Sequence, residues 1–155
     1  MIAKLISTDQ SAHIQKRYIC FNVRLVQDIV DYSEMFNYKG ILLCLDFEKA
    51  FDTVNWDFIL KTLEKYGFSQ NFSKWIKTLH FIQRSNTYNK KNNGWLSKDV
   101  KLYRGIRQGC PLSALLFILA VEILDTKTRE DKDITGYKIK EKEVRISQYE
   151  DDSTI

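Results

Sequence analysis

Apolar residues recur along the chain at spacings that predict an alternation of helices and short strands. Residues 17–36 should form a helix, because apolar side chains return there at steps of three and four. The members of this stripe are Ile19, Val23, Val26 and Val30. Residues 41–45 form a continuous apolar run that follows Gly40 and stops at Asp46, which predicts a strand buried on both faces.

The middle of the chain predicts two consecutive helices. The first should cover about residues 54–66, with Asp52 as its N-terminal cap and Gly67 as its stop. Its inward side chains should be Ile59, Leu63 and Tyr66. Ser69 should cap the second helix. The apolar stripe of that helix comprises Phe72, Trp75, Ile76 and Leu79.

The rest of the pattern predicts two hairpins and one buried helix. Asn92-Asn93-Gly94 is a hairpin-turn signal. Pro111 should open a helix, at the position where its missing N–H costs nothing, and the residues after it are apolar nearly all round, so this helix should be deeply buried. Apolar and charged residues alternate over 137–146, which predicts a half-exposed hairpin. This order of elements favours an α+β domain with helices on one face of an antiparallel sheet.

Composition agrees with a folded domain or part of one. Of 155 residues, 44% are hydrophobic and 28% charged, which excludes disordered and low-complexity classes. The longest uncharged stretch, residues 108–121, is shorter than the roughly 20 residues of a membrane span, so no membrane partner is expected. The three cysteines (Cys20, Cys44 and Cys110) have no metal-binding spacing. They indicate reduced thiols in an intracellular protein, with nucleus and cytoplasm both open.

The net charge is +4, but the charged residues are distributed unevenly along the chain. Residues 60–107 hold eleven Lys and Arg residues but only two acids, Glu64 and Asp99. This basic middle is a candidate phosphate-binding surface. A solvated face of two helices and a loop is the other interpretation.

Two acidic features stand where burial should exclude acids. Asp46 ends the apolar strand, and Asp151-Asp152 lies in what should be a strand or tight turn. Buried carboxylates are usually paired or hold a cation, and carboxylates are the ligands that Mg²⁺ and Mn²⁺ prefer. If the two strands are neighbours, Asp46 and Asp151 converge at one end of the sheet. A helix cap at Asp46 and a surface turn at Asp151-Asp152 is the competing interpretation.

The third candidate is the junction at residues 105–113, between the basic segment and the buried helix. Gly105 and Gly109 let the backbone come close to a ligand, and a helix start after a glycine suits a phosphate group. Arg107 adds a charged fork and Gln108 a hydrogen-bonding amide. A plain loop-to-helix junction is the alternative.

Taken together, these segments resemble the reverse transcriptases of non-long-terminal-repeat retrotransposons (long interspersed elements). Leu45-Asp46-Phe47-Glu48-Lys49-Ala50-Phe51-Asp52 resembles their motif A. Residues 105–113, with Arg107-Gln108-Gly109-Cys110-Pro111-Leu112-Ser113 at their centre, resemble motif B. Tyr149-Glu150-Asp151-Asp152 resembles motif C, the aromatic-x-Asp-Asp box, and residues 5–30 resemble the fingers-side block. The boxes come in the family's order over nearly the whole chain.

The resemblance implies a polymerase palm, which is a ferredoxin-like antiparallel sheet backed by helices, with partial fingers. Residues 1–155 would be a single partial reverse transcriptase domain, with 1–40 as the fingers-side block and 41–155 as the palm. The activity would be RNA-directed DNA polymerisation, in which a primer 3′-hydroxyl attacks the α-phosphate of a dNTP. The partners would be an RNA template, a DNA primer and dNTPs, and the cofactor two Mg²⁺ ions, or Mn²⁺.

Roles at the site also follow from the resemblance. Asp46, Asp151 and Asp152 would be catalytic and, with the carbonyl of Phe47, would ligate the metals. The nucleotide-binding residues would be Phe47, Lys49, Ala50, Phe51, Gln108 and Gly109. Among these, Phe51 would be the steric gate that leaves no room for a 2′-hydroxyl. Template and primer contacts would come from Arg107 and Tyr149.

Several positions depart from the family's pattern. The second place of motif C is usually Ala and here is Glu150. A carboxylate there would compete for the metals or repel the triphosphate, so we expect Glu150→Ala to raise any measurable activity. Upstream, Ala12-His13 stands where the family favours Gly-Phe, and Lys16-Arg17 where it favours Gly-Arg. Ala114 replaces a proline that usually follows motif B.

We expect a fragment truncated at both ends, without the basic fingers strand, the thumb and the endonuclease of the family, and without robust polymerase activity of its own. The alternative is a degenerate, non-catalytic nucleic-acid-binding relic, which would bind in a salt-dependent way and be indifferent to Asp46→Ala. A third hypothesis is an unrelated α+β interaction domain, in which Asp46 and Asp151 would lie apart.

Overall fold

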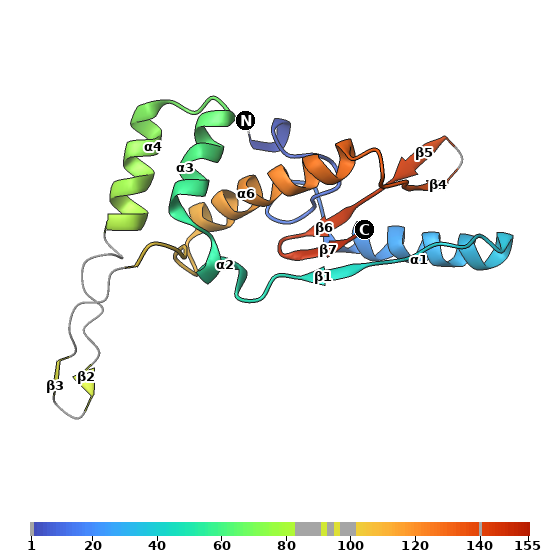
Figure 1. The fold of residues 1–155 in the computed structure, drawn as a ribbon, viewed down its shortest axis with the longest axis horizontal. Coiled ribbons are helices and arrows are strands. Elements are labelled where there is room, and N and C mark those ends of the chain that lie inside the picture. Colours follow the sequence, from blue (N-terminus) through green and yellow to red (C-terminus); the bar gives the residue numbers. More distant parts are fainter. Residues whose placement is uncertain (1, 83–90, 93–94, 97–101, 140) are drawn as a thin grey trace. The chain divides into compact units, whose positions relative to one another are not determined.

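The computed structural model describes residues 2–82, 91–92, 95–96, 102–139 and 141–155. These residues form two compact units. The first unit comprises the chain up to Glu48 together with Ala114–Ile155, and the second comprises Lys49–Ser113. Each unit is considered separately, with the element labels of Figure 1.

A three-stranded antiparallel sheet with the strand order β1-β7-β6 lies at the centre of the first unit. Its strands are β1 (Cys44–Asp46), β6 (Ser147–Tyr149) and β7 (Asp152–Thr154). β6 and β7 are joined by a tight turn, and β7 is the central strand, so the segment that ends at Asp46 pairs with the last residues of the chain. Figure 1 shows this hairpin beside β1.

Helices α1 (Ile19–Phe36) and α6 (Pro111–Glu130) confirm the two longest helical patterns. α6 begins at Pro111, as predicted, and its apolar residues from Leu116 to Val121 are buried. A short 3-10 turn covers Ile2–Lys4. The predicted hairpin at 137–146 is β4 (Tyr137–Ile139) paired with β5 (Lys142–Val144). The mixture of helices with antiparallel sheets confirms the α+β class.

Three helices and a π-helical segment form most of the second unit's described part. They are α2 (Ala50–Thr53), α3 (Trp56–Lys65), α4 (Gln70–Ile76) and the π-helical segment Lys77–Ile82. Strands β2 (Lys91–Asn92) and β3 (Trp95–Leu96) pair as the predicted hairpin, whose turn residues Asn93 and Gly94 lie outside the described residues.

The sequence predicts three helix boundaries in the second unit, of which two are confirmed and one is wrong. Ser69 accepts a hydrogen bond from the Phe72 N–H and caps α4, and Gly67 ends the preceding helix with φ +76°. The prediction of Asp52 as a cap is wrong, because Asp52 lies inside α2. Asn55 caps α3 instead, accepting from the N–H groups of Asp57 and Phe58.

Three apolar segments are less buried in the structure than the sequence predicts. The run 41–45 is a strand only from Cys44 and is exposed along β1, because β1 is at the edge of its sheet. The stripe of α1 is also largely exposed, since none of its residues is fully buried. In α4 and the following segment Ile76 and His80 are buried, whereas Trp75 is 66% exposed and Leu79 is also exposed.

No helix in the described ranges is long and apolar enough to cross a membrane. The three cysteines are free thiols. How the chain divides into fingers and palm, which we expect near residue 40, stays a prediction.

Candidate active site

Asp46 and Asp152 lie directly opposite each other on β1 and β7. Leu43, three positions before Asp46, and Ile155, three positions after Asp152, exchange both backbone hydrogen bonds, at 2.8 and 2.9 Å. Pair types alternate along an antiparallel ladder, so Asp46 and Asp152 form a non-hydrogen-bonded pair. In such a pair the Cα atoms are about 4.5 Å apart and both side chains are on the same face. The ladder therefore brings two carboxylates together, although like charges in opposite positions destabilise a sheet.

Asp151 lies next to this pair, in the turn between β6 and β7. Burial raises the pKa of Asp151, and the negative charges of Glu150, Asp152 and Asp46 raise it further. The negative charge of Asp46 is the smallest of these contributions. The pairing of β1 with β7 favours proximity of Asp46 to the Asp151 turn over the wide separation that the hypothesis of an unrelated interaction domain requires.

These carboxylates are chemically suited to a divalent cation. They provide only oxygen donors, on adjacent strands, and their mutual repulsion is what a bound cation would relieve. In the described part of the chain, no group of three or more His, Cys, Asp or Glu side chains is already arranged as a metal site. It is the chemistry of the oxygen donors, and not a preformed arrangement of three side chains, that fits a cation such as Mg²⁺.

Two buried glutamines hold the turn of this hairpin. The Gln10 side chain accepts from the Glu150 N–H at 3.1 Å and from the Ala12 N–H at 2.8 Å. The Gln148 amide donates to the Glu150 carbonyl at 3.1 Å, and that of Gln10 donates to the same oxygen at 3.4 Å. Both glutamines are fully buried. Glu150 has a φ of +59°, a conformation that glycine prefers, and these bonds fix it.

The segment that carries Gln10 runs beside β6 like a short additional strand. Gln10 forms a parallel bridge with Gln148, and the Ser11 N–H donates to the Gln148 carbonyl at 3.0 Å. The Asn22 amide of α1 donates to Ser147 Oγ and to the Gln148 carbonyl. Arg17 donates to the carbonyls of Ser7 and Gln10. The segment around Gln10 and the helix α1 are thereby tied to the β6–β7 hairpin.

A buried cluster of charges joins the same segment to α6. Arg129 forms ion pairs with Glu122 and, at 3.2 Å, with Asp9. Asp125 is 1% exposed, and its carboxylate oxygens have no hydrogen-bond partner among the described residues. Burial, then the charge of Glu122, raises the pKa of Asp125 to about 7. Nothing in the apolar pattern of α6 indicated this cluster.

In the second unit, the segment after motif A packs against the motif B loop. The Ile106 N–H donates to the Phe51 carbonyl at 2.7 Å, and the Trp56 indole donates to the Gly105 carbonyl at 2.6 Å. Gln108 donates to Asp52 at 3.4 Å. Phe51 and Gln108, both predicted to bind nucleotide, are therefore held in one packed body, in which the Trp56 indole has a structural role.

The junction before α6 has the predicted backbone and an anion-stabilising end. Gly105 and Gly109 have φ values of +92° and +77°. Burial acts to raise the pKa of Cys110, yet hydrogen bonds from Ser113 and Leu112 at the helix start and the charge of Arg107 lower it overall. The start of α6 therefore stabilises negative charge, as a phosphate site requires.

The predicted residues are divided between the two units. Asp46, Phe47, Tyr149, Asp151 and Asp152 belong to the first unit. Lys49, Ala50, Phe51, Arg107, Gln108 and Gly109 belong to the second. Ala50 is buried, whereas Arg107, Gln108 and Gly109 are exposed. The structure brings together the three aspartates in one unit and the residues around Phe51 and Gln108 in the other.

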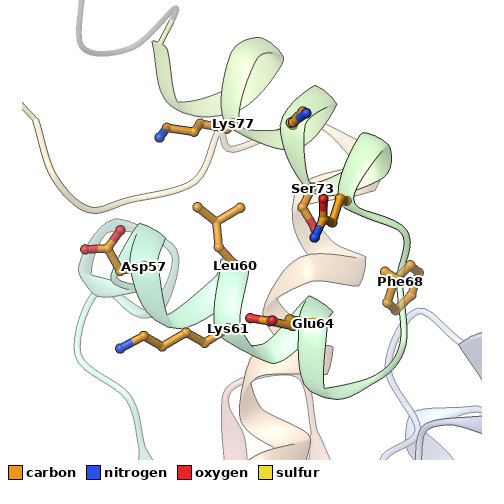
Figure 2. Close-up of a pocket in the computed structure, with 9 residues that line it drawn as sticks. Asp57, Leu60, Lys61, Glu64, Phe68, Ser73 and Lys77 are labelled. Carbon is orange, nitrogen blue, oxygen red and sulfur yellow. The ribbon is translucent and has the colours of Figure 1, made fainter.

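A groove between α3 and α4, with a volume of about 420 Å³, is separate from these residues (Figure 2). Leu60 and Phe68 contribute apolar surface to it, and acidic and basic side chains such as Glu64 and Lys77 lie around them. None of the predicted site residues lines this groove. We therefore place the candidate active site at the carboxylates and not at this hollow.

Comparison with known proteins identifies the family of the chain. The family model described as reverse transcriptase (RNA-dependent DNA polymerase) matches residues 1–155. A protein of Xenopus laevis named "Transposon TX1 uncharacterized 149 kDa protein" is 36% identical over 154 residues, 98% of this chain and 11% of that protein. The Pol polyprotein from the type-2 retrotransposable element R2DM of Drosophila melanogaster is 32% identical over 105 residues, 62% of this chain and 9% of that protein. The chain thus spans about a tenth of the length of these relatives.

Proposed function

This chain belongs to the reverse transcriptase (RNA-dependent DNA polymerase) family, and we propose that it forms the catalytic palm of a non-long-terminal-repeat retrotransposon polymerase. In this proposal the chain contributes to a single reverse transcriptase domain, with residues 1–40 on the fingers side and 41–155 in the palm. The substrates are a dNTP and a primer 3′-hydroxyl, positioned by an RNA template. Membership of the family supports nucleic acid as the partner and a divalent metal as the cofactor.

One observation carries the proposal: three carboxylates are concentrated at the end of one small sheet. Asp46 and Asp152 are directly opposite in the ladder, and Asp151 is close enough for the charge of Asp46 to raise its pKa. Such a concentration of negative charge opposes folding. A cation-dependent reaction is the simplest reason for a fold to retain it.

Asp46, Asp151 and Asp152, with the Phe47 carbonyl, would hold two Mg²⁺ ions. When bound, such ions supply activation of the attacking oxygen and neutralisation of charge on the phosphates. The protein's own part is positioning. The Phe51 ring excludes a 2′-hydroxyl, and the exposed Arg107 and Gln108 contact the nucleic acid and the nascent pair. The N–H groups of Lys49 and Ala50 meet the triphosphate, Gly109 lies under the base pair, and Tyr149 contacts the primer end.

Primer extension on an RNA template tests this function. The full-length protein that carries this chain should extend a DNA primer with dNTPs in a Mg²⁺-dependent way, and Asp46→Ala should abolish extension because it removes one of the three carboxylates. Asp133→Ala changes an exposed aspartate of the first unit and should leave extension intact. The 155-residue chain alone should show no robust extension, since it is a small part of its relatives' length.

The non-catalytic relic predicts a different result. It would bind RNA or DNA in a salt-dependent way, would not extend a primer with any divalent metal, and would be unaffected by Asp46→Ala. Robust extension by the 155-residue chain would contradict our expectation for the isolated fragment.

A further inference from the structure

Two of the positions that depart from the family's pattern meet in the structure. His13 Nε2 lies 2.9 Å from Glu150 Oε1, although the residues are 137 positions apart in the chain. An imidazole N–H donates hydrogen bonds and a carboxylate accepts them, whereas Phe at position 13 or Ala at position 150 could not form this contact. The two departures are therefore chemically complementary, since each supplies the partner that the other needs.

The backbone explains why Glu150 needs a partner. Glu150 is the first of the two residues in the turn between β6 and β7, and its φ is +59°. Gln10 and Gln148 bind its N–H and carbonyl groups, so the turn cannot easily reorient. Asp151 follows immediately, so the two carboxylate-bearing residues are adjacent in the turn. A Glu150 carboxylate without a partner would therefore lie at the edge of the aspartate cluster.

His13 is well placed to restrain that carboxylate. It lies three residues after Gln10, in the segment that pairs with β6, and has a φ of +53°. Its side chain is 41% exposed and that of Glu150 is 27% exposed. An exposed pair of this kind contributes little to stability. Its effect must lie mainly in where it holds the carboxylate.

We propose that His13 is a positioning residue that holds the Glu150 carboxylate away from the cations bound by Asp46 and Asp151. This proposal rests on the proposed function of the three aspartates. It also refines the expectation for Glu150→Ala. With His13 present, removal of the carboxylate should raise extension only slightly, within about twofold, as for a surface substitution. Without His13, the carboxylate is free to ligate a cation beside Asp151, and its removal should restore activity.

A double-mutant cycle in the full-length protein tests the proposal. The four proteins are the wild type, His13→Phe, Glu150→Ala and the double variant, in which neither partner of the contact is present. His13→Phe should lower the rate of primer extension at saturating dNTP about tenfold, as replacement of groups that orient metal ligands does. It should also shift the Mg²⁺ concentration for half-maximal rate. Both effects should disappear in the double variant.

Two further variants separate positioning from folding. His13→Gln keeps an N–H donor and should restore most of the activity that His13→Phe loses. Lys16→Phe introduces the same ring at another exposed, left-handed position of this loop (φ +67°) and should have no effect. Equal losses from His13→Phe with and without Glu150, or no loss in either, would overturn the proposal.

A measurement of metal binding separates the proposed role of His13 from the proposed polymerase function. Mn²⁺ binding that is lost in Asp46→Asn, measured by electron paramagnetic resonance, reports the aspartate site without any turnover. If the wild type shows neither such binding nor extension, the proposed function fails and the role of His13 fails with it. If the wild type shows both and the cycle shows no coupling, only the role of His13 is overturned.

Discussion

Replacing Asp151 by Asn should lower the rate of nucleotide addition by the full-length protein at least about a thousandfold, which corresponds to about 4 kcal/mol at the transition state. The amide keeps the size of the side chain but removes the negative charge that a divalent cation requires. The measurement is single-turnover primer extension on an RNA template. Asp133→Asn, at an exposed position, is the matched control and should retain full activity.

The same substitution should make the protein more stable when no metal is bound. Asp151 has a raised pKa because it is partly buried and lies beside Glu150, Asp152 and Asp46. Removing its charge should raise the free energy of unfolding, because a carboxyl group whose pKa is raised in the folded state destabilises that state when it is ionised. Mg²⁺ should stabilise the wild type more than the variant. An Asp151→Asn protein that still extends primers, or that is less stable in EDTA, would contradict this account.

Asp125→Asn should stabilise the protein strongly, and more so at high pH. The raised pKa of about 7 results first from burial and then from the charge of Glu122. In the unfolded chain the carboxyl group ionises near its usual value of 3.8. Ionisation therefore favours the unfolded state above pH 4, and wild-type stability is lost as the pH rises through 7. Asn never ionises, so the variant escapes this loss.

The expected gain from Asp125→Asn is about 4 kcal/mol at pH 8 and less than about 2 kcal/mol at pH 5, at 1.36 kcal/mol per pKa unit. Urea unfolding of wild type and variant at both pH values measures it. Asp133→Asn, at an exposed position of the same unit, should change stability by less than about 0.5 kcal/mol at either pH. An equal effect of Asp125→Asn at pH 5 and pH 8 would show that Asp125 is ionised in the folded protein.

Local signals predicted the elements that carry the candidate site. An acid directly after an apolar run indicated the end of β1 at Asp46, and the position of Pro111 indicated the start of α6. Ser69 and Gly67 marked helix boundaries because capping and left-handed turns depend on single residues. The convergence of Asp46 with Asp151 followed from these elements once the two strands were assumed to be neighbours.

Contacts between distant segments explain the errors. An apolar pattern shows which face of an element is apolar but does not show what covers that face. For this reason the run at 41–45 and the stripe of α1 are predicted as buried and are largely exposed in the structure. The prediction that Trp75 is buried is wrong for the same reason. The buried side of this helical segment includes His80 and excludes Leu79.

The hydrogen bonds that hold the motif C turn could also not be predicted from local sequence patterns. Gln10 and His13 bind Glu150 from about 140 positions away, and no spacing rule relates such residues. The buried Glu122 and Asp125, with the half-buried Arg129, lie on a helix whose preceding residues are strongly apolar. A search for charged residues at buried positions of α6 could have found it.

Anomalous scattering from Mn²⁺ tests the central claim most directly. Crystals of the full-length protein with an RNA template, a DNA primer, a dNTP and Mn²⁺ would show where the metal binds. We predict two Mn²⁺ peaks at the end of the sheet, ligated by Asp46 and Asp151 with Asp152 beside them, and none in Asp46→Asn. A Mn²⁺-saturated complex with no metal on Asp46 or Asp151 would contradict the assignment of these carboxylates as the catalytic centre.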